Sequence, residues 1–263
     1  MEITKALQDL IQENDLYKLA ESLCQNKNNG KRLITDVAIS KIPYVMYPDL
    51  TKTQSLIVHE LAEHLLNLAK SQNNSNEIAV TYNLDNNDDI SNGMMEVLEK
   101  TGICFGTNNE TELFSDSKTM SIINRAKSIA IVNLHNHPSC NTFSIQDISV
   151  FLKETAIKLM LVLGNNGELY YLSKNIDKYN FLQAREYLVN ATKAVAPTIG
   201  NKKQTFLTYK EMRDIGDLFL KNCDQFGIEY KHVLGNEREL QQVKSMTYED
   251  NQQEEEIDYD QDR

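Results

Sequence analysis

Apolar residues recur at helical spacing along much of this chain, with polar residues on the opposite side of each predicted helix. The pattern is strongest at 53–71, where leucine and isoleucine alternate with charged and amide side chains at the 3.6-residue period. The predicted helices cover residues 2–25, 53–71, 91–102, 117–127, 144–156 and most of 177–230.

Short runs rich in β-branched and aromatic residues lie between these helices and predict strands. They cover residues 77–84, 103–114 (as two strands), 128–137 and 157–172. The last run contains Asn166-Gly167, a pair that suits the type I′ turn of a β-hairpin. This order predicts an α/β (α+β) fold, a mixed sheet flanked by helices, with helical N- and C-terminal extensions.

Acidic residues are concentrated at the C-terminal end. The 263 residues include 27 Lys or Arg and 38 Asp or Glu, which gives a net charge of −11. Residues 249–263 contain eight acids and one arginine, so this stretch carries −7 and the other 248 residues carry −4. We therefore expect an acidic disordered tail at 249–263 behind a nearly neutral body that shows no basic patch for nucleic acid.

Composition narrows the class of protein further. Hydrophobic residues make up 41% of the chain, enough for a packed core, and no apolar run approaches the ~20 residues of a membrane span. The first ten residues carry charges where a signal peptide would be apolar. The four cysteines, Cys24, Cys104, Cys140 and Cys223, form no CxxC motif. We expect reduced thiols and a cytoplasmic protein with no membrane partner.

Two histidines mark the end of the strand predicted at 128–137. His135 and His137 are two residues apart, so both imidazoles lie on one face of the strand, close enough to bind one ion. Ser144 opens the next predicted helix, with Asp147 in its first turn facing back to the histidines. Two histidines and one carboxylate leave a fourth tetrahedral position open, as in catalytic zinc sites.

Each part of this motif also has a purely structural interpretation. A histidine pair at a strand end is often partly exposed and binds no metal. The segment from Ser144 to Asp147 has the pattern of a capping box, which stabilises a helix start without any catalysis. Both parts occur within one loop, which favours a metal site, and capping is compatible with metal binding.

Residues 135–147, HNHPSCNTFSIQD, resemble the signature of the JAMM (MPN-plus, JAB) metalloproteases, in which H-x-H is followed by a loop and S-x-x-D. The opening His-Asn-His-Pro-Ser is similar to the bacterial RadC-like branch. Two features depart from the pattern. Six residues rather than seven separate His137 from Ser144, and Cys140 stands where the family usually has glycine.

The resemblance implies a division of the chain into four parts. A JAB/MPN-like metalloprotease domain would cover 51–175, after an N-terminal helical extension at 1–50. A C-terminal helical region at 176–248 would follow it, before the tail.

The family also has a glutamate beside the zinc water, upstream of the signature. Glu77 is our candidate, because it follows the long amphipathic helix and opens a predicted strand. Glu96 and Glu99 are alternatives if residues 92–98 form a strand instead of a helix.

The resemblance further implies Zn²⁺-dependent hydrolysis of a peptide or isopeptide bond. The substrate would be a protein or peptide, which includes a ubiquitin-like conjugate. Each site residue would have one role: metal ligands His135, His137 and Asp147, proton acceptor and donor Glu77, and oxyanion donor Ser144.

A second hypothesis assigns the same JAB-like domain to a protein that does not hydrolyse peptide bonds. The chain would then be a non-catalytic or RadC-like JAB-domain protein associated with DNA repair or with mobile-element and phage functions. RadC-like proteins carry a DNA-repair association in their name, and some relatives of the wider fold have lost the metal. DNA association and oligomeric state therefore stay open.

The segment from His59 to His64, HELAEH, is not an HExxH metal motif. Its histidines are five residues apart instead of four, which places them about 140° apart around a helix. We expect both side chains on the flanks of a surface helix.

Overall fold

The computed structural model describes residues 30–86, 93–108, 111, 116–195 and 207–234. The predicted first helix at 2–25 and the acidic tail at 249–263 lie outside these residues. The elements in chain order are α3 (Asp36–Ser40), α4 (Lys52–Gln72), β1 (Ile78–Asn83), α5 (Met94–Glu99), β2 (Gly102–Phe105), α6 (Ser117–Arg125), β3 (Ile131–His137), α7 (Ile145–Lys153), β4 (Ile157–Gly164), β5 (Leu169–Lys174), α8 (Phe181–Val195), α9 (Tyr209–Asn222) and β6 (Ile228–Val233), with 3-10 turns at Leu84–Asn86 and Cys223–Phe226.

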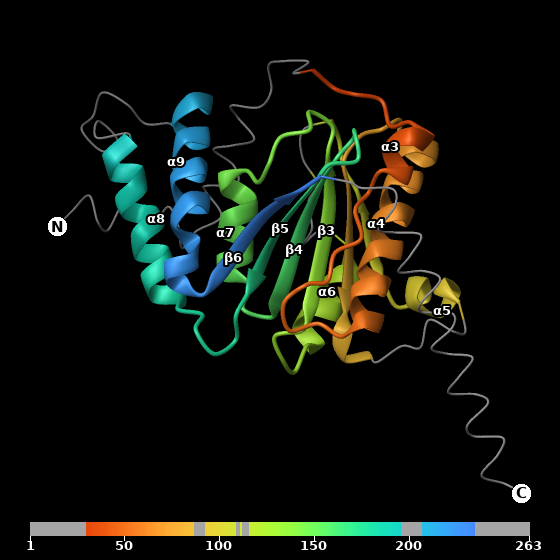
Figure 1. Ribbon diagram of the computed structural model, residues 1–263, viewed down its shortest axis with the longest axis horizontal. Helices are drawn as coiled ribbons and strands as arrows, with labels where there is room; N and C mark the ends of the chain where they lie inside the picture. The colour runs from red at the N-terminus through yellow and green to blue at the C-terminus, as the bar shows by residue number, and fades with distance from the viewer. Residues whose placement is uncertain (1–29, 87–92, 109–110, 112–115, 196–206, 235–263) are drawn as a thin grey trace, which may run out of the picture.

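A six-stranded mixed sheet in the order β2-β1-β3-β4-β5-β6 forms the centre of the fold (Figure 1). β3 and β4 are parallel, and the other neighbouring pairs are antiparallel. Parallel neighbours need a crossover connection, which α7 provides between β3 and β4. The predicted mixed sheet flanked by helices is therefore confirmed.

Helices cover both faces of this sheet, with α3, α4 and α5 on one side and α7, α8 and α9 on the other (Figure 1). Successive residues of β3 point to opposite faces. Val132 and Leu134 join the core beneath α4, whereas Ile131 joins the core beneath α7. His135 and His137 continue the alternation of Ile131, so both face the α7 layer.

Helix α4 agrees with the predicted amphipathic helix at 53–71. Its N-terminus is fixed by a capping box in which the Gln54 N–H donates to the Thr51 hydroxyl and the Thr51 N–H donates to the Gln54 side chain. His59 differs from our expectation of an exposed flank, because it is 2% exposed and packs edge-on to the Tyr44 ring. No described helix has both the length and the apolar character required to cross a bilayer.

The described part of the predicted N-terminal extension belongs to the main core. Residues 30–50 contain one short helix, α3, and are otherwise loop and turn without regular secondary structure. Ile34, Ile42 and Tyr47 are buried in the same cluster as the inner face of α4. This segment therefore packs as part of the sheet domain.

Two local details differ from the sequence prediction. The described residues of 177–230 are mostly helical, as predicted, in α8 and α9, but the sequence did not predict strand β6 (Ile228–Val233), which pairs with β5 along its whole length. The β4–β5 turn is not type I′, because only Gly167 takes a positive φ (88°) while Asn166 does not. The Gly167 N–H instead closes the turn on the Gly164 carbonyl at 2.9 Å, the pattern of a turn followed by a glycine bulge.

Candidate metal centre

The two histidines of β3 lie at the end of the strand, as the sequence predicted. His135 is 3% exposed and His137 is half-buried, with ring centroids 4.9 Å apart. β3 is an inner strand, flanked by β1 and β4. The imidazoles are therefore carried by a rigid part of the molecule.

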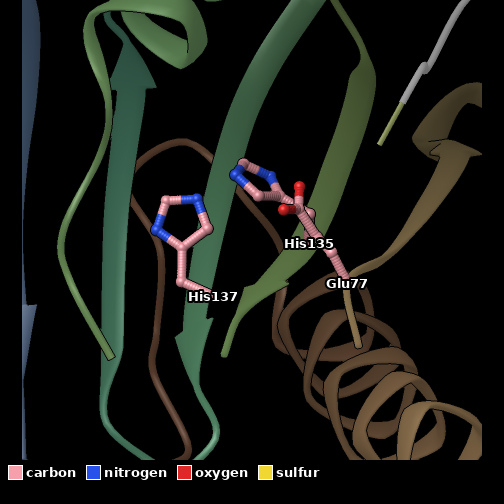
Figure 2. Close-up of side chains that lie close together, drawn as sticks. All are labelled: Glu77, His135 and His137. Carbon is pink, nitrogen blue, oxygen red and sulfur yellow. The ribbon is translucent and has the colours of Figure 1, made fainter. Parts of the chain in front are cut away.

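The register of β1 on β3 brings Glu77 to this pair. Ala79 is the partner of His135, so Glu77, two residues earlier, is on the same face and across from His137. One ligand atom from each of Glu77, His135 and His137 lies within 4.8 Å of the others, and Figure 2 shows the Glu77 carboxylate beside the His135 ring. Glu77 is 7% exposed, so these atoms meet in a largely buried site.

The alternative glutamates lie elsewhere. Residues 94–99 form helix α5 and not a strand, so the condition that would have favoured Glu96 or Glu99 is not met. Both side chains are exposed, and the Glu96 carboxylate pairs with Lys100 at 2.8 Å. The structure thus places Glu77, and neither alternative, beside the histidines.

Asp147 reaches the histidines from the first turn of α7. Its carboxylate oxygens lie 3.2 Å from His135 Nε2 and 3.5 Å from His137 Nε2. The predicted capping box is also formed: the Ser144 N–H donates to Asp147 Oδ2, and the Asp147 N–H donates to Ser144 Oγ. One carboxylate therefore both fixes the helix start and contacts both imidazoles.

The surroundings of Asp147 favour its ionised form. Burial acts to raise the pKa of this carboxyl, but the neighbouring His135 and His137 and the hydrogen bond from Ser144 outweigh it. The net result is a pKa held well below the usual value, so Asp147 is a carboxylate at neutral pH.

Hydrogen bonding defines the tautomer of His137. Its Nδ1 lies 2.9 Å from the Asn141 carbonyl oxygen, which can only accept, so Nδ1 carries the hydrogen. In the neutral imidazole the lone pair is then on Nε2, the atom that faces Asp147. A backbone carbonyl in this position is a common way to orient a metal-binding histidine.

The site residues suit a divalent cation. Among the described residues, neither ring nitrogen of His135 has a hydrogen-bond partner of good geometry, although both are buried. Buried polar atoms are seldom left unpaired, and a cation would satisfy one of them. Two carboxylates and two imidazoles also match the charge and the nitrogen and oxygen ligands that zinc prefers.

Cys140 lies in the loop after the histidines, with a left-handed backbone (φ 59°) that a glycine would adopt without strain. Burial raises the pKa of its thiol, which disfavours the thiolate needed for metal binding. Cys140 is not part of the group of ligand atoms that converge in the described structure.

Sequence reasoning did not identify the buried amides around the site, above all Asn136 and Asn165.

Comparisons of the chain with protein-family models, with curated proteins and with solved structures found no significant match.

Proposed function

We propose that this protein is a zinc-dependent hydrolase that cleaves a peptide or isopeptide bond. The observation that supports this best is the convergence of the Glu77, His135 and His137 ligand atoms within 4.8 Å, beside the Asp147 carboxylate. The likeness of residues 135–147 to the JAMM signature supports the reaction class.

His135, His137 and Asp147 would hold the metal, with His137 binding through Nε2. Zinc supplies a Lewis acid and lowers the pKa of a coordinated water towards ~7. Glu77, the remaining carboxylate, would take a proton from the attacking water and pass it to the leaving amine. The carbonyl carbon gains the water oxygen as its bond to nitrogen breaks, which yields one carboxylate and one amine.

Ser144 would stabilise the oxyanion of the tetrahedral intermediate. Its oxygen accepts the Asp147 N–H, which leaves the hydroxyl hydrogen to donate. A donor of this kind commonly contributes about 10²–10³ in rate.

Metal analysis tests the first half of the proposal. Protein purified without chelators, and then equilibrated with zinc, is assayed for zinc, iron and manganese by mass spectrometry. We expect stoichiometric zinc in the wild type and in His232→Ala, whose histidine is exposed on β6, and a loss of zinc in His137→Ala. A wild type that takes up no zinc would refute the proposal.

Hydrolysis of a complex peptide mixture, with cleavage sites read by mass spectrometry, tests the second half. Glu77→Gln removes the proton acceptor and should lower the rate by about 10²–10⁴. Glu96→Gln, an exposed residue of α5, serves as the control. Equal cleavage by the wild type and Glu77→Gln would contradict the assigned role.

A further inference from the structure

A network of buried amide side chains lies directly behind the metal centre. Asn136 stands between the two histidines in sequence and points to the opposite, α4-covered face of the sheet. It is 0% exposed, and Asn165, in the turn after β4, is 1% exposed. A buried primary amide is costly unless its donors and acceptor are paired, so its contacts indicate why it is there.

The Asn136 side chain forms hydrogen bonds with the backbone of both residues that flank Glu77 in the sequence. The Ile78 N–H donates to Asn136 Oδ1 at 2.8 Å, and Asn136 Nδ2 donates to the Asn76 carbonyl at 3.2 Å. The backbone pairing of β1 with β3 ends at Ala79 and His135. The Asn136 side chain therefore continues the ladder by two bonds past the point where the two backbones stop pairing.

The loop that leads into Glu77 is strained. Asn74 and Ser75 both have left-handed backbones, with φ of 48° and 58°. Residues other than glycine adopt this backbone conformation rarely, and it persists where surrounding contacts hold it. Asn165 provides one such contact, because its Nδ2 donates to the Ser75 carbonyl at 2.9 Å.

Asn165 also connects this loop to Asn136 and to the N-terminal segment. Its Oδ1 accepts from Asn136 Nδ2 at 2.8 Å, and its Nδ2 donates to the Arg32 carbonyl at 2.7 Å. The Arg32 N–H in turn donates to the carbonyl of Pro138, the residue after His137. The segment before Glu77 and the loop after the histidines are thus joined by one continuous set of hydrogen bonds.

We infer that Asn136, supported by Asn165, is a positioning residue that holds the Glu77 carboxylate against the histidine pair. The Glu77 N–H and C=O bond to Thr107 and Gly106 on the β2 side. Asn136 supplies the matching constraint on the β3 side, from the residue that separates the two histidines. It therefore ties Glu77 to the strand that carries the imidazoles.

The inference rests on the proposed function, because it assigns a purpose to the position of Glu77. It extends the site beyond the motif residues to Asn165 and to the backbone of Arg32, which lies outside the span of the JAMM resemblance.

Zinc affinity, measured by competition with a chromophoric chelator, provides the first test. We expect Asn136→Ala to weaken zinc binding about 10–100-fold, because Asn136 also fixes the end of β3 that carries both histidine ligands, and loss of an outer-shell partner typically has an effect of this size. Asn133→Ala is the matched control, since Asn133 is also a buried asparagine of β3 bonded to β1, through the Thr81 hydroxyl at 3.0 Å, but lies farther from the site. It should lose stability and keep its zinc affinity within about 3-fold of the wild type.

Hydrogen exchange in metal-free protein provides the second test. The Ile78 amide should lose protection in Asn136→Ala and keep it in Asn133→Ala, because only Asn136 accepts its hydrogen. Asn165→Ala, which leaves that bond in place, should weaken zinc binding by a smaller factor and keeps the test valid if Asn136→Ala does not fold.

The outcomes separate the two proposals. Unchanged zinc affinity in both Asn136→Ala and Asn165→Ala would overturn the positioning role while the hydrolase proposal stands. A wild type that binds no zinc would refute the hydrolase proposal, and the exchange data would still decide the positioning role. Equal Ile78 protection in Asn136→Ala and Asn133→Ala would overturn it.

Discussion

Lys174, the last residue of β5, offers a quantitative test of the core packing. It is 0% exposed, its Nζ donates to the Glu154 carbonyl at 2.8 Å, and the rings of Phe151 and Tyr179 lie 4.6 and 4.9 Å from it. Burial lowers the pKa of this amine from its usual 10.5 to about 7, and the Glu154 carboxylate counteracts only part of the shift. The amine is therefore largely deprotonated in the folded protein at mildly alkaline pH.

This shift makes the free energy of unfolding depend on pH. Between pH 7 and 10.5 the unfolded chain binds a proton at Lys174 that the folded chain does not, so stability rises with pH across this window. One pKa unit corresponds to about 1.4 kcal/mol, so the full difference is about 5 kcal/mol and the part gained from pH 7 to 9 is about 2 kcal/mol. Below pH 7 both states are protonated and the full cost is present.

Lys174→Met removes the titration while keeping an apolar chain of similar length. At pH 6 we expect the variant to be more stable by on the order of 3 kcal/mol, since the lost hydrogen bond and cation–π contacts offset part of the gain. By pH 9 nearly all of that advantage, about 2.7 kcal/mol, should be lost. Urea unfolding with chelator present, at pH 6, 7, 8 and 9, measures the difference.

Lys153→Met, at an exposed position at the end of α7, controls for the general effect of removing a charge. The difference in free energy of unfolding between Lys153→Met and the wild type should not vary with pH. If the free energies of unfolding of the wild type and Lys174→Met differed by the same amount at pH 6 and pH 9, burial would not lower the pKa of Lys174 as argued.

Two further predictions concern the turn and the core of the sheet domain. Gly167→Ala places a Cβ 2.1 Å from the Ala38 carbonyl oxygen at φ 88°, and should destabilise by about 2–4 kcal/mol in urea unfolding. Gly93→Ala, at a similar φ with nothing within 4 Å, should cost only about 1 kcal/mol, and equal losses would show that the contact with Ala38 is unimportant. Leu161→Ala, 0% exposed in β4, should cost about 2–5 kcal/mol, whereas Leu182→Ala, 70% exposed, should change thermal stability by less than about 0.5 kcal/mol.

Most helices and strands of the described residues follow from local pattern. Helix α4 buries the face whose apolar period is visible in the sequence, and strand β3 follows an apolar run and is buried on both faces. β6 was missed because its residues alternate over a short run at a sheet edge, with the half-exposed or exposed Tyr230 and His232. Its strand conformation depends on pairing with β5, a contact between segments more than 50 residues apart.

The candidate site divides in the same way. His135, His137, Ser144 and Asp147 lie within one loop and its flanking elements, so spacing alone predicted their proximity. Glu77 reaches them only through the register of β1 on β3, which the sequence does not specify.

The network amides were beyond sequence reasoning for a related reason. Asn136 bonds to residues 58 and 60 positions away, so no local spacing carries a signal for it. Its role becomes visible only when the backbone of the sheet is in place.

The pairing of β6 with β5 has a practical consequence for anyone who wishes to express the candidate metal centre alone. A fragment ending at residue 175 would leave β5 as an unprotected edge and would remove the cover that α8 and α9 give to Met160, Val162 and Leu172. Exposed strand edges promote aggregation, so such a fragment should be insoluble. A fragment that also began at residue 51 would lose the segment at 30–50, which contributes side chains to the core beneath α4. The smallest piece of this protein worth producing is therefore 30–234.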